Sequence, residues 1–239
     1  PVGRVECGDD LRLAYRDEIA RIAARDLGDP DPLELLDDVA AELADLADAT
    51  VEAALAIARQ EVGPQQAARA RLGIIALGKC GAQELNYVSD VDVLYVAEPA
   101  VDAEGAVLAS GEEAVQIAAR LASSLTRTCS AHTAAGTIWQ VDAALRPEGK
   151  AGPLVRTLAS HEAYYAKWAK GWEFQAMLKA RPMAGDLEVG QAFVDMIAPR
   201  VWQVAERDKF VADCQAMRRR VIQHIPLKEQ KLELKLGEG

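Results

Sequence analysis

The stretch LGKCGAQELNYVSDVDVLYV, residues 77–96, places a glycine-containing loop just before two aspartates in an apolar run. The loop contains Gly78, Lys79 and Gly81, and the aspartates are Asp90 and Asp92. A buried strand normally excludes carboxylates, because an unpaired charge away from water is very costly. We therefore expect a bound cation beside these two side chains.

The spacing of the two aspartates places them on one side of a strand. Residues two apart in a strand point the same way, with Cα atoms roughly 6.6 Å apart, so Val91 and Val93 pack on the opposite side. Convergent carboxylates suit Mg²⁺ or Mn²⁺, which bind such oxygens together with substrate phosphates. A pair of aspartates is weak support on its own, since such pairs are often strand-edge or capping residues.

The loop before the aspartates has the composition of a phosphate-binding loop. Glycines allow backbone N–H groups to approach a phosphate closely. Lys79 adds a positive charge, although a lysine on a solvated loop surface is the plainer interpretation. Ser89 could bond either a phosphate oxygen or its own backbone. The loop is not a Walker A motif, because G-x-x-x-x-G-K-[ST] is absent.

A third aspartate lies in IWQVDAALRP, residues 138–147. On a predicted strand, alternation puts Asp142 on the same face as Gln140, and Arg146 shares that parity just beyond the strand end. Three carboxylates around two metal ions can clamp the attacking and leaving oxygens of a phosphoryl displacement. The plainer alternative is a strand-end acid that pairs with Arg146.

The rest of the sequence is mostly helical in pattern. Short apolar runs typical of buried strands occur at residues 72–77, 91–96 and 136–145. Helical spacing predicts helices at residues 11–27, from Asp31 as an N-cap, and at 51–60, 112–128, 160–169, 172–181, 188–202 and 208–225, with a break at Pro199. The sequence therefore predicts an α+β fold with a majority of helix. It comprises a helical lead-in at 1–68, a core with a small mixed sheet at 69–157 and a C-terminal helical region at 158–239.

The composition narrows the class of protein. Of 239 residues, half are hydrophobic and 27% are charged, as in soluble folded proteins. The net charge of −10 disfavours nucleic-acid binding, which needs a basic surface. Four scattered cysteines favour reduced thiols over a disulfide scaffold or a zinc site. No apolar run approaches the ~20 residues of a membrane span, so we expect a cytoplasmic protein without membrane contact.

Three motifs resemble a known family. The order of glycine loop, paired aspartates and later aspartate resembles that of the DNA polymerase β-like nucleotidyltransferases. With h for a hydrophobic residue, GKCGAQELNYVSDVDVLYV (78–96) is similar to the G-K-h-G-G-x-E-L-x-Y-x-S-D-h-D-h-h-h of the glutamine synthetase adenylyltransferase/adenylyl-removing enzymes. VDAALRPEGKAGPLV (141–155) and WEFQAMLKARPMAGD (172–186) resemble that family's V-D-x-x-L-R-P-x-G-x-x-G-x-L-V and W-E-x-x-A-h-h-K-A-R-x-h-x-G-D. Ala82 departs from the pattern, because many members have a second glycine there.

The resemblance implies a fold and an activity. It makes residues 69–157 a polymerase β-like nucleotidyltransferase core, flanked by N-terminal helices and a C-terminal helical bundle. Enzymes of this family have two related halves: the C-terminal half attaches AMP to a tyrosine of glutamine synthetase, and the N-terminal half removes it by phosphorolysis, releasing ADP. The segment ELNYVSD (84–90) and the helical lead-in are similar to the N-terminal half. We therefore expect the adenylyl-removing domain of a longer protein that regulates nitrogen assimilation.

The resemblance also implies partners. These are glutamine synthetase, phosphate, and ADP or ATP, with a regulatory signalling protein that acts through parts of the longer enzyme outside this chain. One alternative is the same site running ATP-dependent adenylyl transfer to glutamine synthetase. Another is a regulatory module that binds nucleotide or glutamine synthetase without turnover.

The implied roles of individual residues follow from the reaction. Asp90, Asp92 and Asp142 would hold two Mg²⁺ or Mn²⁺ ions. Inorganic phosphate is already an anionic nucleophile, so it needs positive charge beyond the metals rather than a base. Arg146 is the first candidate for that charge. Lys179 and Arg181 come next, since arginine can grip phosphate bidentately, with a solvated helix end as the plainer interpretation.

Overall fold

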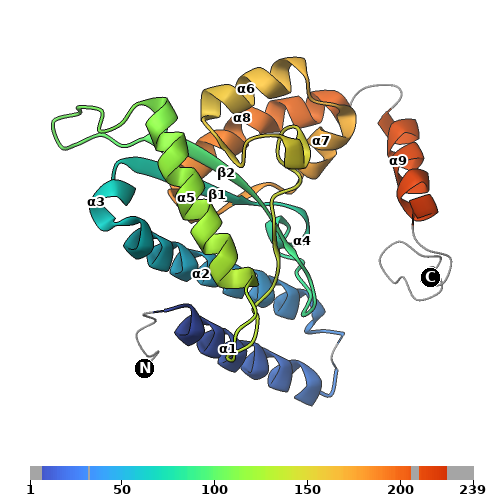
Figure 1. Ribbon diagram of the computed structural model, residues 1–239. Coiled ribbons are helices and arrows are strands. Elements are labelled where there is room, and N and C mark those ends of the chain that lie inside the picture. Colours follow the sequence, from blue (N-terminus) through green and yellow to red (C-terminus); the bar gives the residue numbers. More distant parts are fainter. Residues whose placement is uncertain (1–6, 32, 206–209, 225–239) are drawn as a thin grey trace.

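The computed structural model describes residues 7–31, 33–205 and 210–224 (Figure 1). In chain order its elements are α1 (Gly8–Gly28), α2 (Leu36–Val62), α3 (Pro64–Ala67), β1 (Ala70–Ala76), α4 (Gly78–Gly81), β2 (Val91–Pro99), α5 (Gly111–Ser130), β3 (Val141–Asp142), the 3-10 helix η1 (Gly149–Ala151), β4 (Val155–Arg156), α6 (Leu158–Lys167), α7 (Gly171–Ala176), β5 (Arg181–Gly185), α8 (Leu187–Ala205) and α9 (Phe210–His224). This mostly helical α+β architecture confirms the predicted fold class. Within the described ranges, no helix combines the length and apolar character needed to cross a membrane.

The five strands form one mixed sheet in the order β3-β2-β1-β5, with β4 also paired to β2. Strand β1 is antiparallel to β2 and to β5, whereas β3 and β4 are both parallel to β2. Because β1 occupies one edge of β2, β3 and β4 lie one after the other along the opposite edge. Asp92 is opposite Asp142, and Tyr95 is opposite Val155. The chain therefore leaves this edge after Asp142 and returns at Val155, and we call the intervening residues the 143–154 loop.

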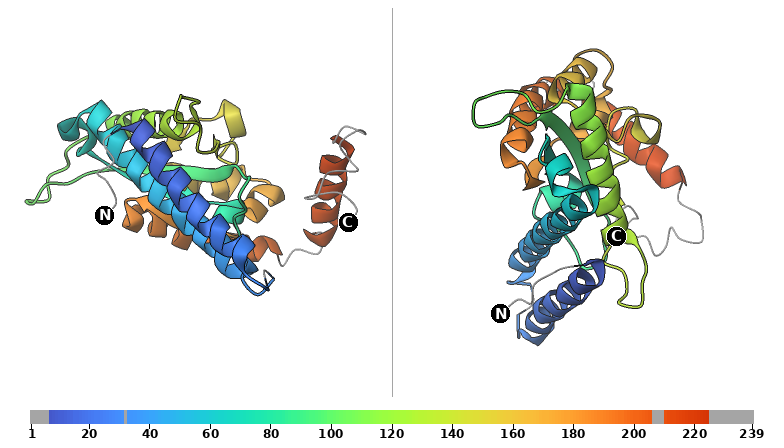
Figure 2. Two further views of the ribbon diagram at one scale, coloured as in Figure 1. Left: turned by 90° about the horizontal axis from the view of Figure 1, so that it is seen from below. Right: turned by 60° about the vertical axis from the view of Figure 1, so that its left-hand side comes forward.

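Helices cover both faces of the sheet (Figures 1 and 2). Side chains of β2 alternate: Val93 and Tyr95 join the core packed against α1, α2 and α5, while Leu94 and Val96 join the core packed against α6, α7 and α8. Burial on both faces explains why this strand is a nearly continuous apolar run. Each fully buried aliphatic side chain contributes roughly 1.5–3 kcal/mol, so the sheet is a rigid support for the acids at its edge.

Helix α5 confirms the helix predicted at residues 112–128. The Ser110 hydroxyl accepts a hydrogen bond from the Glu113 backbone amide, and the Ser110 backbone amide donates to the Glu113 carboxylate, which forms a capping box at the start of the helix. Ile117, Leu121 and Leu125 are fully buried along one face. The opposite, polar face of this helix lies towards the 143–154 loop and is described with the site.

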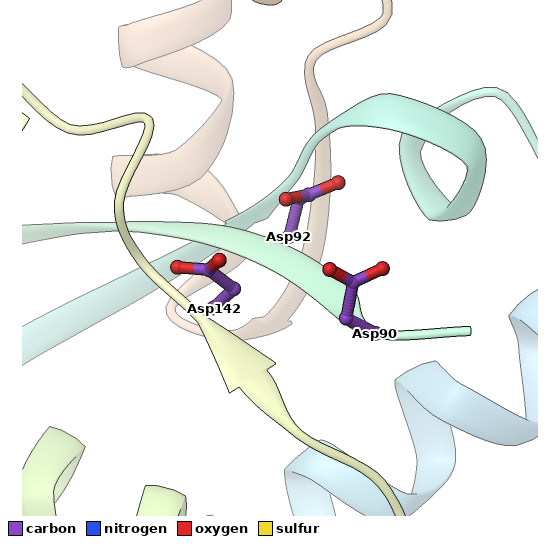
Figure 3. A group of neighbouring side chains, drawn as sticks. All are labelled: Asp90, Asp92 and Asp142. Carbon is purple, nitrogen blue, oxygen red and sulfur yellow. The ribbon is translucent and has the colours of Figure 1, made fainter. Parts of the chain in front are cut away.

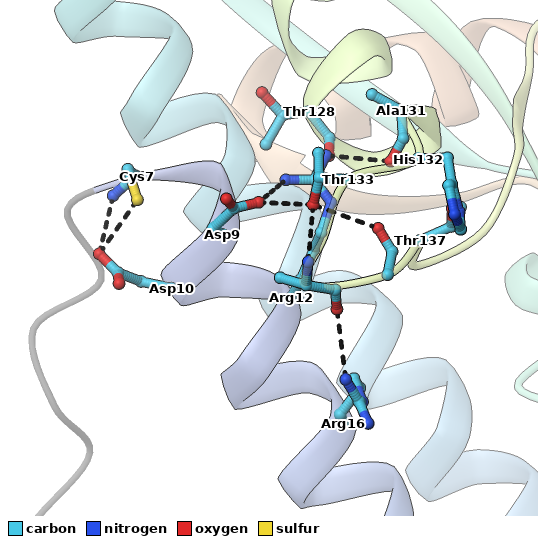
Figure 4. Close-up of polar contacts among 12 residues, drawn as sticks. Cys7, Asp9, Asp10, Arg12, Arg16, Thr128, Ala131, His132, Thr133 and Thr137 are labelled. Carbon is cyan, nitrogen blue, oxygen red and sulfur yellow. Dashed lines mark hydrogen bonds and ion pairs between the residues drawn. The ribbon is translucent and has the colours of Figure 1, made fainter.

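Arg12 fastens α1 to the end of α5 (Figure 4). Its nearly buried guanidinium donates to the carbonyls of Thr128 at 2.6 Å and Ala131 at 3.2 Å, and it pairs with Asp9 at 3.0 Å. Thr133 donates to the same Asp9 carboxylate at 2.7 Å. The last carbonyls of a helix lack partners within the helix, so a buried arginine satisfies groups that would otherwise be left unpaired.

Two predictions about the N-terminal helices are wrong. Helix α2 is capped by Leu35 rather than Asp31, because the Asp29 carboxylate bonds the Asp31 backbone at 2.9 Å and holds this segment in a turn. Pro32, the predicted first helical residue, lies outside the described residues. Residues 51–60 are not a separate helix but the C-terminal half of α2.

The strand predicted at 136–145 is shorter than expected. Only Val141 and Asp142 pair with β2, because the Ser130 hydroxyl bonds the backbone on either side of Gln140: it donates to the Trp139 carbonyl and accepts from the Val141 amide. Side-chain bonds of this kind compete with a strand ladder.

The C-terminal part contains a strand that was not predicted from the sequence. Helix α7 ends at Ala176, not at Arg181, and residues 181–185 form β5 at the free edge of β1. Pro199 lies inside α8 and does not end it. The helix predicted at 208–225 is present as α9 over 210–224; residues 208, 209 and 225 lie outside the described residues.

Candidate functional site

Three acidic side chains meet at one end of the sheet (Figure 3). Asp90 immediately precedes β2, Asp92 is the second residue of β2, and Asp142 lies beside Asp92 on β3. One carboxylate oxygen from each lies within 4.8 Å of the other two. Asp90 is exposed, and the other two are half-buried. The arrangement brings together the acids that the sequence singled out.

The backbone around the acids is fixed by hydrogen bonds. The Val91 amide donates to the Gln140 carbonyl at 3.0 Å, and the Leu77 amide donates to the Asp92 carbonyl at 2.9 Å. Oδ1 of Asp142 accepts from the Ala144 amide at 2.7 Å, which fixes the orientation of this carboxylate. Asp92 and Asp142 are therefore held on paired strands, and Asp90 is adjacent to the first residue of β2, which is itself bonded to the neighbouring segment.

The donor set fits a divalent cation. Three carboxylates this close repel one another in the absence of a positive charge. Hard oxygen ligands at the start of a rigid strand suit Mg²⁺ or Mn²⁺. Asp90, Asp92 and Asp142 are the side chains that would hold it.

The predicted loop contains one helical turn, α4, and its first glycine lies against the acids. Gly78 has φ +54°, and a Cβ built there would stand 2.6 Å from Oδ2 of Asp92. A Cβ on Gly81 would stand 2.1 Å from the Lys179 carbonyl oxygen. Both positions therefore require glycine, Gly78 because of its left-handed backbone and the acid, and Gly81 because two segments of main chain meet there.

The polar residues of the loop have identifiable positions. Lys79 donates to the side-chain oxygen of Asn86 at 3.2 Å. Glu84 pairs with Lys179 at 2.5 Å, so its carboxylate braces the loop. The Ser89 hydroxyl makes no hydrogen bond to any described residue. Burial raises the pKa of the Cys80 thiol to about 12, so this cysteine stays protonated and offers no nucleophile.

The two arginines proposed for phosphate have partners in the fold. Arg146 donates to the carbonyls of Ala143, Lys150 and Gly152 at 2.7, 3.3 and 3.2 Å, and it forms no ion pair within the described part of the chain. Arg181 donates to both carboxylate oxygens of Asp48, at 2.5 and 3.0 Å. Burial raises the pKa of Asp48 although the guanidinium opposes this.

A groove of about 780 Å³ adjoins the acids. It runs between α5 and the 143–154 loop, and Asp90 and Asp142 are among its lining residues. Its other lining residues are Ser123, Thr126, Arg127, Ser130, Gln140, Val141, Ala143, Arg146, Lys150 and Leu154. Of the predicted phosphate-binding residues, Arg146 lines this groove, whereas Lys79, Lys179 and Arg181 do not.

Sequence reasoning missed the polar wall of this groove. Ser123, Thr126, Arg127 and Ser130 have the spacing that puts side chains on one face of a helix, opposite the apolar face that was recognised. Lys150, in the turn after Arg146, was also missed. Nothing in either segment alone shows that the two face each other.

Comparison with known proteins gives the family. Residues 4–196 match the family described as glutamate-ammonia ligase adenylyltransferase. The bifunctional glutamine synthetase adenylyltransferase/adenylyl-removing enzyme of Cutibacterium acnes is 62% identical over 231 residues, 97% of this chain and 23% of the relative. The enzymes of the same name from Streptomyces avermitilis and Bifidobacterium longum subsp. infantis are 58% and 47% identical, over 99% and 98% of this chain and 23% and 21% of the relatives.

This chain thus spans less than a quarter of the length of those relatives. The family match includes all three acids, the glycine turn and the 143–154 loop. The chain therefore belongs to the glutamate-ammonia ligase adenylyltransferase family.

Proposed function

We propose that this chain is the adenylyl-removing domain of a longer enzyme. It cleaves the bond between AMP and a tyrosine of glutamine synthetase with inorganic phosphate and releases ADP. The observation that carries the proposal is the cluster of Asp90, Asp92 and Asp142. The names of the relatives supply the two candidate directions, and the segment ELNYVSD (84–90) with its helical lead-in supports the removing direction.

The reaction needs little chemistry from the side chains. An oxygen of inorganic phosphate attacks the phosphorus of AMP, the bond from phosphorus to the tyrosine oxygen breaks, and the tyrosine oxygen takes up a proton from water. Mg²⁺ or Mn²⁺, when bound, would neutralise charge on the phosphate oxygens. Because phosphate is anionic at neutral pH, no general base is required.

The chain's own residues position the reactants. Asp90, Asp92 and Asp142 hold the two cations that we propose. The backbone at the start of the turn, from Gly78, and the Lys79 ammonium receive phosphate oxygens, and Ser89 adds a hydroxyl beside Asp90. Gly81 serves the site by its lack of a side chain, because its amide donates to the Leu77 carbonyl at 2.9 Å. Arg146 contributes through the loop that it organises. Lys179 and Arg181 stay candidates only if their pairs with Glu84 and Asp48 open when substrate binds.

The decisive experiment incubates the chain with adenylylated glutamine synthetase, Mg²⁺ and phosphate. We expect phosphate-dependent release of ADP. Asp90→Asn and Asp142→Asn should each reduce release by at least about 100-fold, since each removes a charged ligand from the site. Calorimetric titration with Mn²⁺ should show the same two variants binding the ion more weakly.

A matched control is Asp195→Asn, the same change on the exposed surface of α8, which should leave ADP release unchanged. Full activity in both site variants would remove these acids from the mechanism. Labelling of glutamine synthetase from ATP, without phosphate-dependent ADP release, would support adenylyl transfer instead. Nucleotide binding with neither reaction would support a regulatory module.

A further inference from the structure

The groove beside the acids is lined by charges of both signs. Asp90 and Asp142 are acidic, whereas Arg127, Arg146 and Lys150 are cationic. Such a concentration of cations is notable in a chain with net charge −10. The aliphatic part of its lining is formed by Val141, Ala143 and Leu154, which are partly buried against the core. These three aliphatic side chains can contact an apolar or aromatic group.

The 143–154 loop is folded so that Lys150 is presented to the groove. Glu148 and Gly149 have φ of +63° and +59°, and a Cβ on Gly152 would stand 2.2 Å from the Pro147 carbonyl oxygen. Arg146 closes this tight turn with its three bonds to backbone carbonyls. The turn is therefore rigid.

Lys150 itself is available for a ligand. It is exposed, and its ammonium forms neither a hydrogen bond nor an ion pair with any described residue. Arg127, across the groove, pairs with Glu61 at 2.8 Å, but both side chains are largely exposed. An exposed pair of this kind contributes little, so Arg127 can exchange it for a ligand.

The groove and the glycine turn contact different acids. Gly78 lies against Asp92, while the groove meets Asp90 and Asp142. An in-line displacement places the entering and leaving oxygens on opposite sides of the phosphorus. The compact turn with its backbone amides and Lys79 suits a small anion. The groove has the volume of sites that hold larger groups, so it suits the leaving side.

We propose that this groove seats the segment of the protein substrate that carries the modified tyrosine, and that Lys150 and Arg127 select acidic residues beside that tyrosine. The inference rests on the proposed function for the reaction at the adjoining acids. The tyrosine ring contacts the aliphatic lining, and carboxylates of the same segment reach Lys150 and Arg127. The recognised partner chemistry is an acidic peptide.

A binding experiment tests the groove without turnover. Two fluorescent nine-residue peptides have a central tyrosine, flanked by Asp and Glu in one and by Asn and Gln in the other. Fluorescence anisotropy should show that the acidic peptide binds about fivefold more tightly than the neutral peptide at low salt, which is the upper range for one exposed ion pair. The difference in affinity between the two peptides should be smaller at high salt. Lys150→Glu should weaken acidic-peptide binding about tenfold, since it replaces attraction with repulsion. Lys167→Glu, the same change at an exposed lysine of α6, should leave it unchanged.

A kinetic experiment separates this inference from the proposed function. With adenylylated glutamine synthetase, Lys150→Glu should raise KM for the protein and leave KM for inorganic phosphate unchanged, with an unaltered melting temperature. Equal binding of the two peptides would overturn the inference. A raised KM for phosphate would also overturn it and would indicate that phosphate binds in the groove. If the unaltered chain releases no ADP but binds the acidic peptide through Lys150, the proposed reaction fails and the peptide groove stands.

Discussion

Because Gly78 lies against Asp92, the substitution Gly78→Ala should reduce both ADP release and Mn²⁺ affinity. The new Cβ would stand 2.6 Å from Oδ2 of Asp92, so the carboxylate must retreat by roughly 0.8 Å to reach ordinary van der Waals contact. Metal–ligand distances tolerate only about 0.2 Å, and a misplacement of about 1 Å can cost 100-fold in rate. We expect ADP release to fall about ten- to hundredfold, and Mn²⁺ to bind more weakly.

Gly105→Ala is the matched control. Gly105 also has a left-handed backbone, with φ +83°, but nothing lies within 4 Å of the position of its Cβ. Both substitutions should lower the free energy of unfolding by about 1–2 kcal/mol, because alanine disfavours positive φ. Only Gly78→Ala adds the clash with the acid.

The assays are urea denaturation for the free energy of unfolding, calorimetry for Mn²⁺ and a coupled assay for ADP. If Gly78→Ala binds Mn²⁺ and releases ADP as well as Gly105→Ala does, the glycine turn does not set the position of Asp92. The reasoning from close approach would then be refuted. Loss of Mn²⁺ binding in both variants would point to global destabilisation instead.

Three further predictions concern stability, each measured by urea denaturation. Burial lowers the pKa of His161 to about 4, so the unfolded chain takes up the proton at a higher pH than the folded chain does. The free energy of unfolding should therefore drop by about 3 kcal/mol between pH 6.5 and 4. A His161→Gln variant that shows the same drop would exclude this histidine as its source. Arg12→Met should lower the free energy of unfolding by about 2 kcal/mol, because it leaves buried helix carbonyls unpaired. Arg16→Met, at an exposed site on the same helix, should change the free energy of unfolding by less than about 0.5 kcal/mol. Arg181→Gln should lower the free energy of unfolding by about 2 kcal/mol, because it leaves the Asp48 carboxylate half-buried and unpaired. Adding Asp48→Asn should recover part of that stability. If the effects of the two changes simply add, the ion pair does not contribute to stability.

Asp90 and Asp92 could be predicted from the sequence because their geometry is local: two residues of one strand point the same way whatever the rest of the chain does. Asp142, fifty positions later, was recognised from the apolar run and the motif around it. The glycine turn was recognisable for the same reason. The role of Gly78 as a neighbour of Asp92 was not, because it depends on how the turn packs against β2.

Partners distant in the sequence could not be predicted. Arg181 meets Asp48 across 133 positions, and Lys179 meets Glu84 across 95, so each had the appearance of an unpaired cation at a helix end. Strand β5 was missed because its residues, RPMAG, carry neither alternation nor β-branched side chains. Only the free edge of β1 makes them a strand. The division of the chain at residues 68 and 157 stays a prediction.

Strand β5 is synthesised more than a hundred residues after its partner β1, and this order has a consequence for biosynthesis. Strand β1 is made early, yet one of its two neighbours is residues 181–185, with Ile74 opposite Ala184. A nascent chain on the ribosome that has not reached Gly185 exposes a row of unpaired amides and carbonyls next to the strand that carries Asp92. Such an edge recruits other chains, and pairing over this sequence distance is slow. Any expression fragment that stops before Gly185 should aggregate, even though it contains every acid of the site.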